Sequence, residues 1–389
     1  MHSPSMRASG KSRDTSTLRP SSSAAKDGRA RAWSAKACLT DEQVIAFVSA
    51  GLTEAELAPV DQHLDECPWC ASLVIEAVRA GEQRAPRAHF SNGRCWTLRP
   101  GDRIGNRYDV VRTLGQGGMS DVFEAFDSHL QQPVALKTAR ATRCDLVDEA
   151  ERLSSEFRLG SRVLHANVCR PFELGVHGEQ RSNDDRIHYF TMDLIRGSSL
   201  ARWRRMSAPG VSTVLVLGRE LLRGVAAIHH AGVIHRDIKS SNIMLRDDDI
   251  SRIAIIDFGL AVSRSSVVGA APSTAAASSF EGSPAYMAPE QFRGSDVTPA
   301  TDVFACGAVL FEALTGRVPF CSLRAEKTGP WRDPCEVAAP ASAFDSSVPR
   351  ALERFIARCL EIDPAERYCS ADEALRALDA VACSGRGEP

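Results

Sequence analysis

Three side chains of different chemistry lie within six positions of one short stretch of the chain, namely Asp237, Lys239 and Asn242. A loop that holds an acid, a lysine and an amide so close together can serve a single phosphoryl transfer. Such a reaction also needs a nucleotide, a metal ion and an acceptor group. Residues for these must therefore come from other parts of the chain.

The segment around these residues resembles the catalytic loop of the protein kinase family. His235 and Arg236 precede Asp237, Lys239 stands two positions after Asp237, and Asn242 follows three positions later. The resemblance implies that Asp237 accepts the hydroxyl proton of the substrate, Lys239 faces the transferring phosphate and Asn242 binds a metal ion. Lysine at this position favours serine or threonine over tyrosine as the acceptor.

A glycine-rich turn lies between two predicted strands, at residues 108–114 and 122–126. Such a hairpin can lie over ATP with its backbone N–H groups on the phosphates. Its Gly-Gly-Met sequence is similar to that of bacterial serine/threonine kinases, although Ser120 replaces the usual third glycine. The ATP contacts implied by the resemblance are Gly115, Gly117, Gly118 and Val122.

The next strand carries the sequence Val-Ala-Leu-Lys, which matches another kinase motif and assigns Ala135 and Lys137 to the ATP site. A buried lysine needs a partner, and Glu156, in a predicted helix at 149–164, resembles the family's pairing glutamate. Gly160 falls one turn later. In a helix interior it would cost roughly 0.5–1 kcal/mol relative to alanine and loosen the helix.

Residues 187–195 form a predicted strand that enters a hinge between two lobes. The resemblance makes Met192 the gatekeeper and gives Asp193 and Ile195 backbone contacts to adenine. A further buried strand is predicted at residues 253–256. It ends at the Asp-Phe-Gly triplet, where the resemblance implies that Asp257 and Asn242 hold Mg²⁺ or Mn²⁺ on the ATP phosphates.

A flexible Ser/Ala-rich segment follows and leads into residues 282–290, which resemble the loop that receives a polypeptide substrate. Ser283 keeps the hydroxyl of the usual threonine, and Glu290 is expected to pair with Arg367 and support this loop. In the family, an arginine such as Arg236 often meets a phosphorylated loop. Candidate phosphorylation sites are Ser263, Ser265, Ser266, Ser273, Thr274, Ser278 and Ser279, although a serine-rich loop can also be merely solvated.

Residues 37–80 carry two capping boxes followed by apolar positions at helical spacing, so they predict a small helical unit. His63 and Cys67 share one helix face, and Pro68 begins a helix that brings Cys70 to the same point. Together with an upstream cysteine these ligands suit tetrahedral structural zinc. The segment resembles the zinc-binding anti-sigma-factor domains. The alternative is a three-helix unit with buried thiols. The predicted zinc ligands are Cys38, His63, Cys67 and Cys70.

The composition of the 389-residue chain is ordinary for a globular protein, with 43% hydrophobic and 25% charged residues and a net charge of −2. The bulk charge gives no indication of nucleic acid or an acidic membrane as a partner. No apolar run approaches the ~18–20 residues that span a bilayer, and no secretory signal is evident. The twelve cysteines are therefore expected to be free thiols or metal ligands, and a cytoplasmic location is expected.

These patterns predict an α+β protein with a two-lobed protein kinase fold, a β-rich small lobe and a helical large lobe, preceded by a small helical zinc-binding module. The predicted parts are a disordered tail at 1–36, the zinc module at 37–80, a linker at 81–105, the kinase domain at 106–382 and a tail at 383–389.

The leading hypothesis is an autophosphorylating serine/threonine protein kinase that acts on protein substrates, with the zinc module serving regulation or partner binding. Its support is that every charged group of the kinase motifs is present. The alternative is a pseudokinase scaffold whose zinc module binds a sigma factor or another protein. Ser120 and Gly160 favour this alternative weakly, because both depart from the family pattern.

Overall fold

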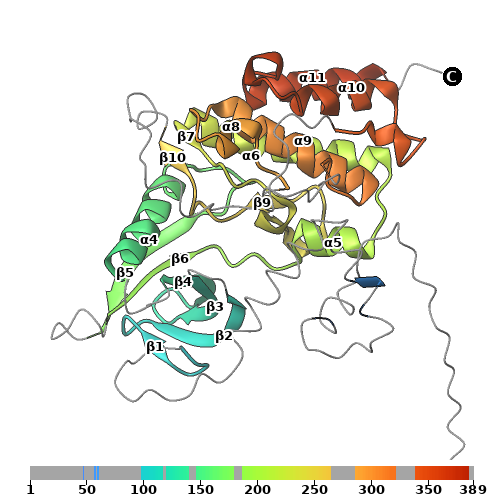
Figure 1. The fold of residues 1–389 in the computed structure, drawn as a ribbon. Helices are drawn as coiled ribbons and strands as arrows, with labels where there is room; N and C mark the ends of the chain where they lie inside the picture. Colours follow the sequence, from blue (N-terminus) through green and yellow to red (C-terminus); the bar gives the residue numbers. More distant parts are fainter. Residues whose placement is uncertain are drawn as a thin grey trace, which may run out of the picture. The chain divides into compact units, whose positions relative to one another are not determined.

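The computed structural model describes residues 98–116, 120–139, 146–178, 186–263, 285–320 and 338–384, together with positions 47, 57, 59 and 60. The predicted tail at 1–36, nearly all of residues 37–80 and the last five residues lie outside the described part. The described chain forms a sheet-rich lobe followed by a helical lobe (Figure 1), which confirms the predicted two-lobed α+β arrangement.

The small lobe is built on a six-stranded antiparallel sheet in the order β1-β2-β3-β4-β6-β5. Its strands are β1 (Arg103–Ile104), β2 (Tyr108–Gln116), β3 (Ser120–Asp127), β4 (Gln132–Ala139), β5 (Pro171–His177) and β6 (Ile187–Met192). Every second residue of β3 is buried, as expected for a strand with one face on a core. Tyr108, Phe123, Leu136 and Tyr189 form part of that core. β1 lies within the range predicted as linker.

Helix α4 (Leu146–Gly160) packs against β4, β5 and β6, and the ring of Phe157 lies 5.9 Å from that of Phe190 on β6. Leu159, near the end of the helix, belongs to the core of the large lobe. The helix ends at Gly160 and does not continue to residue 164. The predicted cost of a glycine in the helix interior is therefore wrong. A Cβ at Gly160 would lie 3.3 Å from the Pro171 side chain, so glycine here permits the helix end to approach β5 closely.

The large lobe contains six described α-helices: α5 (Leu200–Met206), α6 (Val211–His230), α8 (Pro289–Phe292), α9 (Pro299–Thr315), α10 (Arg350–Cys359) and α11 (Ala371–Ser384). Two short strand pairs join them, β7 (Val233–Ile234) with β10 (Val262–Ser263) and β8 (Ile243–Leu245) with β9 (Ile253–Ile255). The described 3₁₀ turns are η2 (Ser240–Asn242), η3 (Arg246–Asp248), η5 (Ala341–Ala343) and η6 (Pro364–Glu366). No helix in the described ranges is long and apolar enough to cross a membrane.

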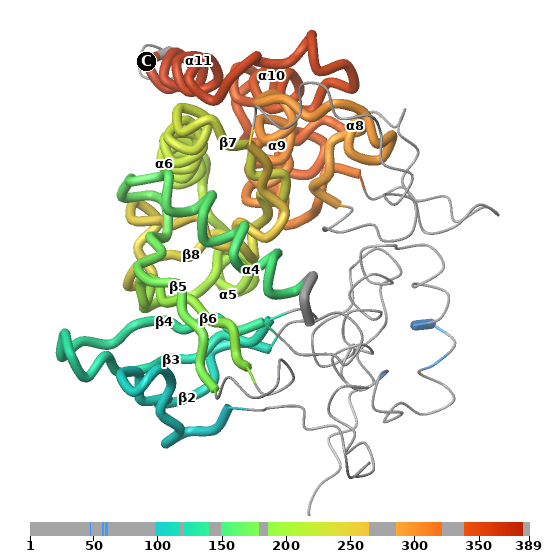
Figure 2. Tube along the Cα trace, turned by 90° about the vertical axis from the view of Figure 1, so that its left-hand side faces the viewer, coloured from blue at the N-terminus to red at the C-terminus, as the bar shows by residue number. Residues whose placement is uncertain are grey.

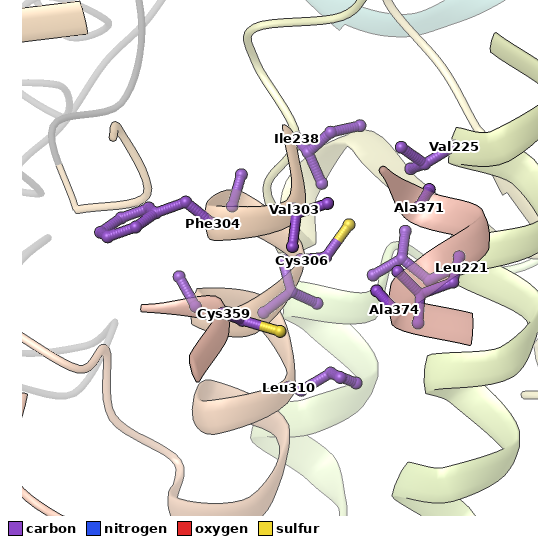
Figure 3. Close-up of a cluster of buried hydrophobic side chains, with 14 of the residues drawn as sticks. Leu221, Val225, Ile238, Val303, Phe304, Cys306, Leu310, Cys359, Ala371 and Ala374 are labelled. Carbon is purple, nitrogen blue, oxygen red and sulfur yellow. The ribbon is translucent and has the colours of Figure 1, made fainter. Parts of the chain in front are cut away.

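Helix α9 is the centre of the large-lobe core, because its side chains from Ala300 to Leu314 are all buried. Figure 2 shows α10 and α11 lying over α9 and α6 on the side away from the sheet. Leu221 of α6, Leu310 of α9 and Ala374 of α11 meet in this core (Figure 3). A Cβ at Gly307 would come within 2.6 Å of Cys359, so glycine is needed where α9 and α10 approach each other.

Candidate active site

The loop from His235 to Asp237 is fixed by a buried carboxylate of α9. Asp302 accepts the backbone N–H groups of His235 and Arg236, both at 2.8 Å, and its Oδ2 lies 2.9 Å from Nε2 of His229. Burial alone would raise the pKa of Asp302, but the hydrogen bonds from His229 and from the backbone of His235 hold the pKa below its ordinary value. Arg236 has φ +68, a conformation that costs on the order of 1–3 kcal/mol. The bonds to Asp302 hold it there.

Three of the predicted residues of this loop are in direct contact. Nζ of Lys239 lies 3.0 Å from Oδ2 of Asp237. The amide Nδ2 of Asn242 donates to the same Oδ2 and to the backbone carbonyl of Asp237, both at 3.0 Å. Asp237 therefore presents a carboxylate whose orientation is fixed by a cation and an amide.

Lys137 of β4 is buried between two carboxylates. Its Nζ lies 2.6 Å from Oε1 of Glu156 on α4, which confirms the predicted pair, and 3.0 Å from Oδ1 of Asp257. Burial would lower the pKa of Lys137, but the two negative charges outweigh it and raise the pKa above its ordinary value. Burial would likewise raise the pKa of Asp257, whereas Lys137 lowers it to about 2. Lys137 and Asp257 are therefore both charged at neutral pH.

The Asp257 segment is joined to the catalytic loop through aromatic packing. The ring of Phe258 lies 5.0 Å from that of His235. Asp257 itself has φ +68, and its Oδ1 accepts the backbone N–H of Gly259 at 3.2 Å. The carboxylate of Asp257 and the loop that holds Asp237 are thus positioned by the same packed core.

Strand register places several predicted ATP contacts on one face of the sheet. Val122 of β3 is opposite Lys137 of β4, and Ala135, two residues before Lys137, is opposite Met192 of β6. Because side chains alternate along a strand, Val122, Ala135 and Lys137 share a face. Apart from its chain neighbours, no atom of the described residues lies within 4 Å of the position of a Cβ at Gly115. Gly117 and Gly118 lie outside the described residues.

The strand β6 ends at Met192. The chain then enters the predicted hinge, which includes Asp193 and Ile195. The backbone N–H of Asp193 donates to the carbonyl of Arg170 at 3.0 Å, which ties the hinge to the residue before β5. The carboxylate of Asp193 lies 3.4 Å from the guanidinium of Arg246 in the large lobe. The sequence analysis did not predict this ion pair between the hinge and the large lobe.

The donor set at the site fits a hard divalent cation. Oδ1 of Asp257 bonds to Lys137 and Gly259, and Nδ2 of Asn242 bonds to Asp237. Within the described part of the chain this leaves Oδ2 of Asp257 and Oδ1 of Asn242 as oxygens that could bind a metal ion. Mg²⁺ prefers such oxygen ligands and completes its shell with water and substrate phosphates. In the described ranges no group of three or more His, Cys, Asp or Glu side chains could hold a metal. The four predicted zinc ligands lie outside these ranges.

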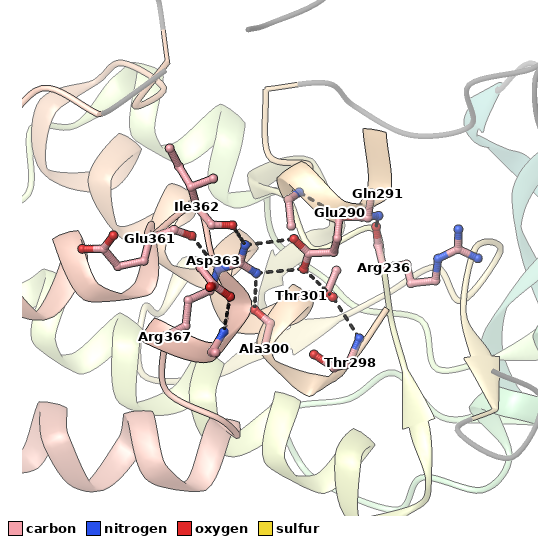
Figure 4. Close-up of polar contacts among 12 residues, drawn as sticks. Arg236, Glu290, Gln291, Thr298, Ala300, Thr301, Glu361, Ile362, Asp363 and Arg367 are labelled. Carbon is pink, nitrogen blue, oxygen red and sulfur yellow. Dashed lines mark hydrogen bonds and ion pairs between the residues drawn. The ribbon is translucent and has the colours of Figure 1, made fainter. Parts of the chain in front are cut away.

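A buried ion pair supports the end of the predicted substrate loop (Figure 4). The guanidinium of Arg367 donates to both carboxylate oxygens of Glu290, at 2.8 and 2.9 Å, which confirms their predicted pairing. Thr301 also donates to Glu290 at 2.7 Å. Gln291, the next residue, donates to the backbone carbonyl of Arg236 at 2.9 Å, so the end of the predicted substrate loop is bonded to the loop that holds Asp237. Ser283 and the serines and threonine at 265–279 lie outside the described residues.

A second buried network was not predicted. The hydroxyl of Tyr286 donates to Glu312 at 2.7 Å, and Oγ of Ser240 lies 2.9 Å from the Tyr286 hydroxyl and 3.3 Å from Glu312. It joins the predicted substrate loop, the loop that holds Asp237, and α9. The available signal was Glu312 itself, a single carboxylate within the apolar run at 303–314. Such a residue either faces water or bonds to buried donors.

Comparison with known proteins gives consistent results. The family model described as the protein kinase domain matches residues 108–378. The serine/threonine-protein kinase PrkC of Bacillus subtilis is 31% identical over 70% of this chain and 40% of its own length. The serine/threonine-protein kinase PknL of Mycobacterium bovis is 33% identical over 72% of this chain and 66% of its own length. The chain thus spans about two fifths of the length of the first relative and about two thirds of the length of the second.

The fold also has solved counterparts. The crystal structure of the PknI kinase domain of Mycobacterium tuberculosis superposes on this chain with a TM-score of 0.55 and 23% sequence identity. The match includes 74% of this chain and the whole of the PknI domain. At 23% identity this match shows that the two chains share a fold, and it is used for the fold alone.

Proposed function

Because this chain belongs to the protein kinase family, we propose that it transfers the γ-phosphate of ATP to serine or threonine hydroxyls of proteins. One observation carries the proposal. Lys137 of β4 contacts Glu156 of α4 at 2.6 Å and Asp257, which follows β9, at 3.0 Å. In the catalytic loop, Asn242 contacts Asp237 at 3.0 Å. These are the charged and amide groups that phosphoryl transfer requires.

The chemistry of each protein group follows from its contacts. The carboxylate of Asp237 accepts the proton of the acceptor hydroxyl, and Lys239, 3.0 Å away, offsets negative charge beside it. Asp257 and Asn242 would hold Mg²⁺, which neutralises charge on the ATP phosphates when bound. Lys137, held by Glu156, binds a phosphate of the nucleotide. Glu290 and Arg367 support the loop on which a polypeptide acceptor would lie.

Incubating the purified full chain with ATP labelled at the γ-phosphate tests this function. We expect label on serine or threonine of the chain itself when Mg²⁺ is present and none when a chelator removes it, because only two protein ligands hold the metal. The Lys137→Met variant should lose the label, whereas Arg354→Met, on the surface of α10, should keep it. Absence of both labelling and a nucleotide-dependent shift in melting temperature would instead favour the pseudokinase scaffold.

Phosphorylation of the segment after Gly259 is proposed as the regulatory event. Nε of Arg236 is buried and has no hydrogen-bond partner in the described part of the chain. Oγ of Ser263, at the start of that segment, lies 3.4 Å from the guanidinium of Arg162. A phosphate carries up to two negative charges and bonds well to guanidinium groups.

Mass mapping of active protein should therefore find phosphate between residues 260 and 282, and the Arg236→Gln variant should lose several-fold in activity only when that phosphate is present. If the unphosphorylated protein is equally active, or Arg236→Gln has the same effect in both forms, the regulatory role is wrong.

For residues 37–80 we propose a structural zinc module that serves regulation or partner binding, with Cys38, His63, Cys67 and Cys70 as ligands. Four protein ligands leave no open position, so the metal would have no catalytic role. Metal analysis of the purified chain should find about one bound zinc, as a single four-ligand site requires. The Cys67→Ser variant should lose it and Cys383→Ser, on α11, should retain it. A chain that binds no zinc would support the alternative unit with free thiols.

A further inference from the structure

A hollow of about 320 Å³ lies beside the hinge, apart from the groups that would carry out the transfer. It is lined by Leu164, His165, Ala166, Val168, Arg170, Asp193 and Arg246. These residues come from three segments, the loop between α4 and β5, the hinge, and the first residue of η3. The hollow shares only Asp193 with the predicted ATP contacts.

The charges around the hollow are mainly positive. Arg170 is exposed and has no carboxylate partner in the described part of the chain. Among the described residues, the only carboxylate partner of Arg246 is Asp193, at 3.4 Å, which is a longer contact than the 2.6 Å of the buried Lys137–Glu156 pair. His165 also lines the hollow, and its Nδ1 accepts the backbone N–H of Asn167 at 3.2 Å. One carboxylate thus faces two arginines, so the hollow favours a ligand with further negative charge.

Exposed apolar side chains lie at the hollow and on the strand that begins directly after Arg170. Leu164 is 79% exposed. On β5, which begins directly after Arg170 and is an edge strand, Phe172, Leu174 and Val176 alternate with more buried residues and are all exposed. Contiguous exposed apolar side chains beside polar groups are typical of protein-binding surfaces. A matching ligand would combine carboxylates with apolar side chains.

Residues 37–80 of the same chain have this composition. They contain eight Asp and Glu residues and a single arginine, a net charge of −7, whereas the rest of the chain carries +5. They also contain apolar positions at helical spacing, among them Val44, Val48 and Leu64. The charge of this segment is therefore opposite to that of the hollow, and its apolar side chains match the exposed apolar side chains at the hollow and on β5.

The connection to the kinase domain is long enough for such a contact. Seventeen residues, 81–97, join the segment to Leu98. Fully extended they span at most about 56–61 Å, and as a flexible coil about 21–25 Å on average. A domain of this size has a radius of gyration of about 19 Å. A tether of this length also gives an effective concentration of the order of millimolar, so weak contacts suffice.

We propose that residues 37–80 dock on this surface, with carboxylates at Arg170 and Arg246 and apolar side chains over Leu164 and the exposed face of β5. A carboxylate at Arg246 would compete with Asp193, which directly follows Met192. Docking would thereby link the N-terminal segment to the hinge. This inference rests on the proposal that residues 37–80 form a regulatory module, and it does not depend on phosphoryl transfer.

Zero-length carbodiimide cross-linking of the full chain tests the contact, because it joins an amine only to a carboxylate in direct contact. The Arg170→Lys variant introduces an amine at the hollow, and Arg354→Lys introduces one on α10 as a matched control. We expect peptides that link position 170 to an acidic residue of 37–80, with a yield several-fold above that of the control. Raising the ionic strength from about 0.1 to about 1 M shortens the Debye length from about 10 to about 3 Å and should reduce this yield.

The same experiment on a mixture of isotopically heavy and light protein distinguishes docking within one chain from docking between two copies. Links that are only heavy–heavy or light–light support the proposal, and mixed links overturn it in favour of a second copy. A yield at position 170 no higher than in the control also overturns it. Because the measurement needs neither ATP nor activity, a chain that cross-links without incorporating label would contradict only the proposed reaction.

Discussion

The Asp237→Ala variant should transfer phosphate to a peptide about 10²–10⁴ times more slowly than the unaltered chain, the usual contribution of a positioned general base. Asp237 is the carboxylate that Lys239 and Asn242 hold at 3.0 Å. Its removal leaves Lys137 and Asp257 in place, so nucleotide binding should persist. The measurement is the turnover number with saturating ATP and peptide, alongside the ATP-dependent shift in melting temperature.

The matched control is Asp345→Ala, which removes a partly exposed carboxylate that, among the described residues, bonds only locally, to the backbone N–H of Ser347, far along the chain from the catalytic loop. Its turnover should equal that of the unaltered protein. If Asp237→Ala has normal turnover, the assignment of the base is wrong. If it loses both turnover and the ATP-dependent shift, Asp237 instead supports the fold of the site.

The Arg367→Met variant should lower the free energy of unfolding by about 3–5 kcal/mol, because removing one partner leaves the other charge buried without compensation. The side chain of Arg367 is fully buried, and it donates to both oxygens of Glu290 and to three backbone carbonyls. Urea denaturation monitored by circular dichroism gives the free energy. The control is Arg252→Met, which removes an exposed ion pair with Asp247 and should change it little.

The destabilisation should depend on pH in a defined direction. Burial would raise the pKa of Glu290, but Arg367 lowers it below the ordinary value. A carboxylate with a lowered pKa in the folded state stabilises the fold above its unfolded pKa, about 4.3, and loses that contribution as the pH falls further. The difference between Arg367→Met and the unaltered chain should therefore be largest near neutral pH and smaller below about pH 4. A difference independent of pH would indicate lost packing rather than a lost ion pair.

The sequence determined those features that depend on neighbours along the chain. The strands around the glycine turn, the loop from Asp237 to Asn242 and the strand that precedes Asp257 all lie where alternation and motif spacing predicted them. Two longer-range pairs, Lys137 with Glu156 and Glu290 with Arg367, were also predicted from family resemblance and are present. Their partners could be named because each belongs to a motif with a fixed position in the chain.

Only the tertiary structure decided how these segments are held. Asp302 accepts the backbone N–H of Arg236, which lies 66 residues earlier in the sequence, and Glu312 accepts from Ser240, which lies 72 residues earlier. No local spacing in the sequence indicates these partners. The positive φ of Arg236 and Asp257 depends on such bonds as well. The end of α4 at Gly160 and the hollow beside Arg170 arise from packing between elements. Composition and periodicity tell which groups will be buried, but the packed core determines which of them meet.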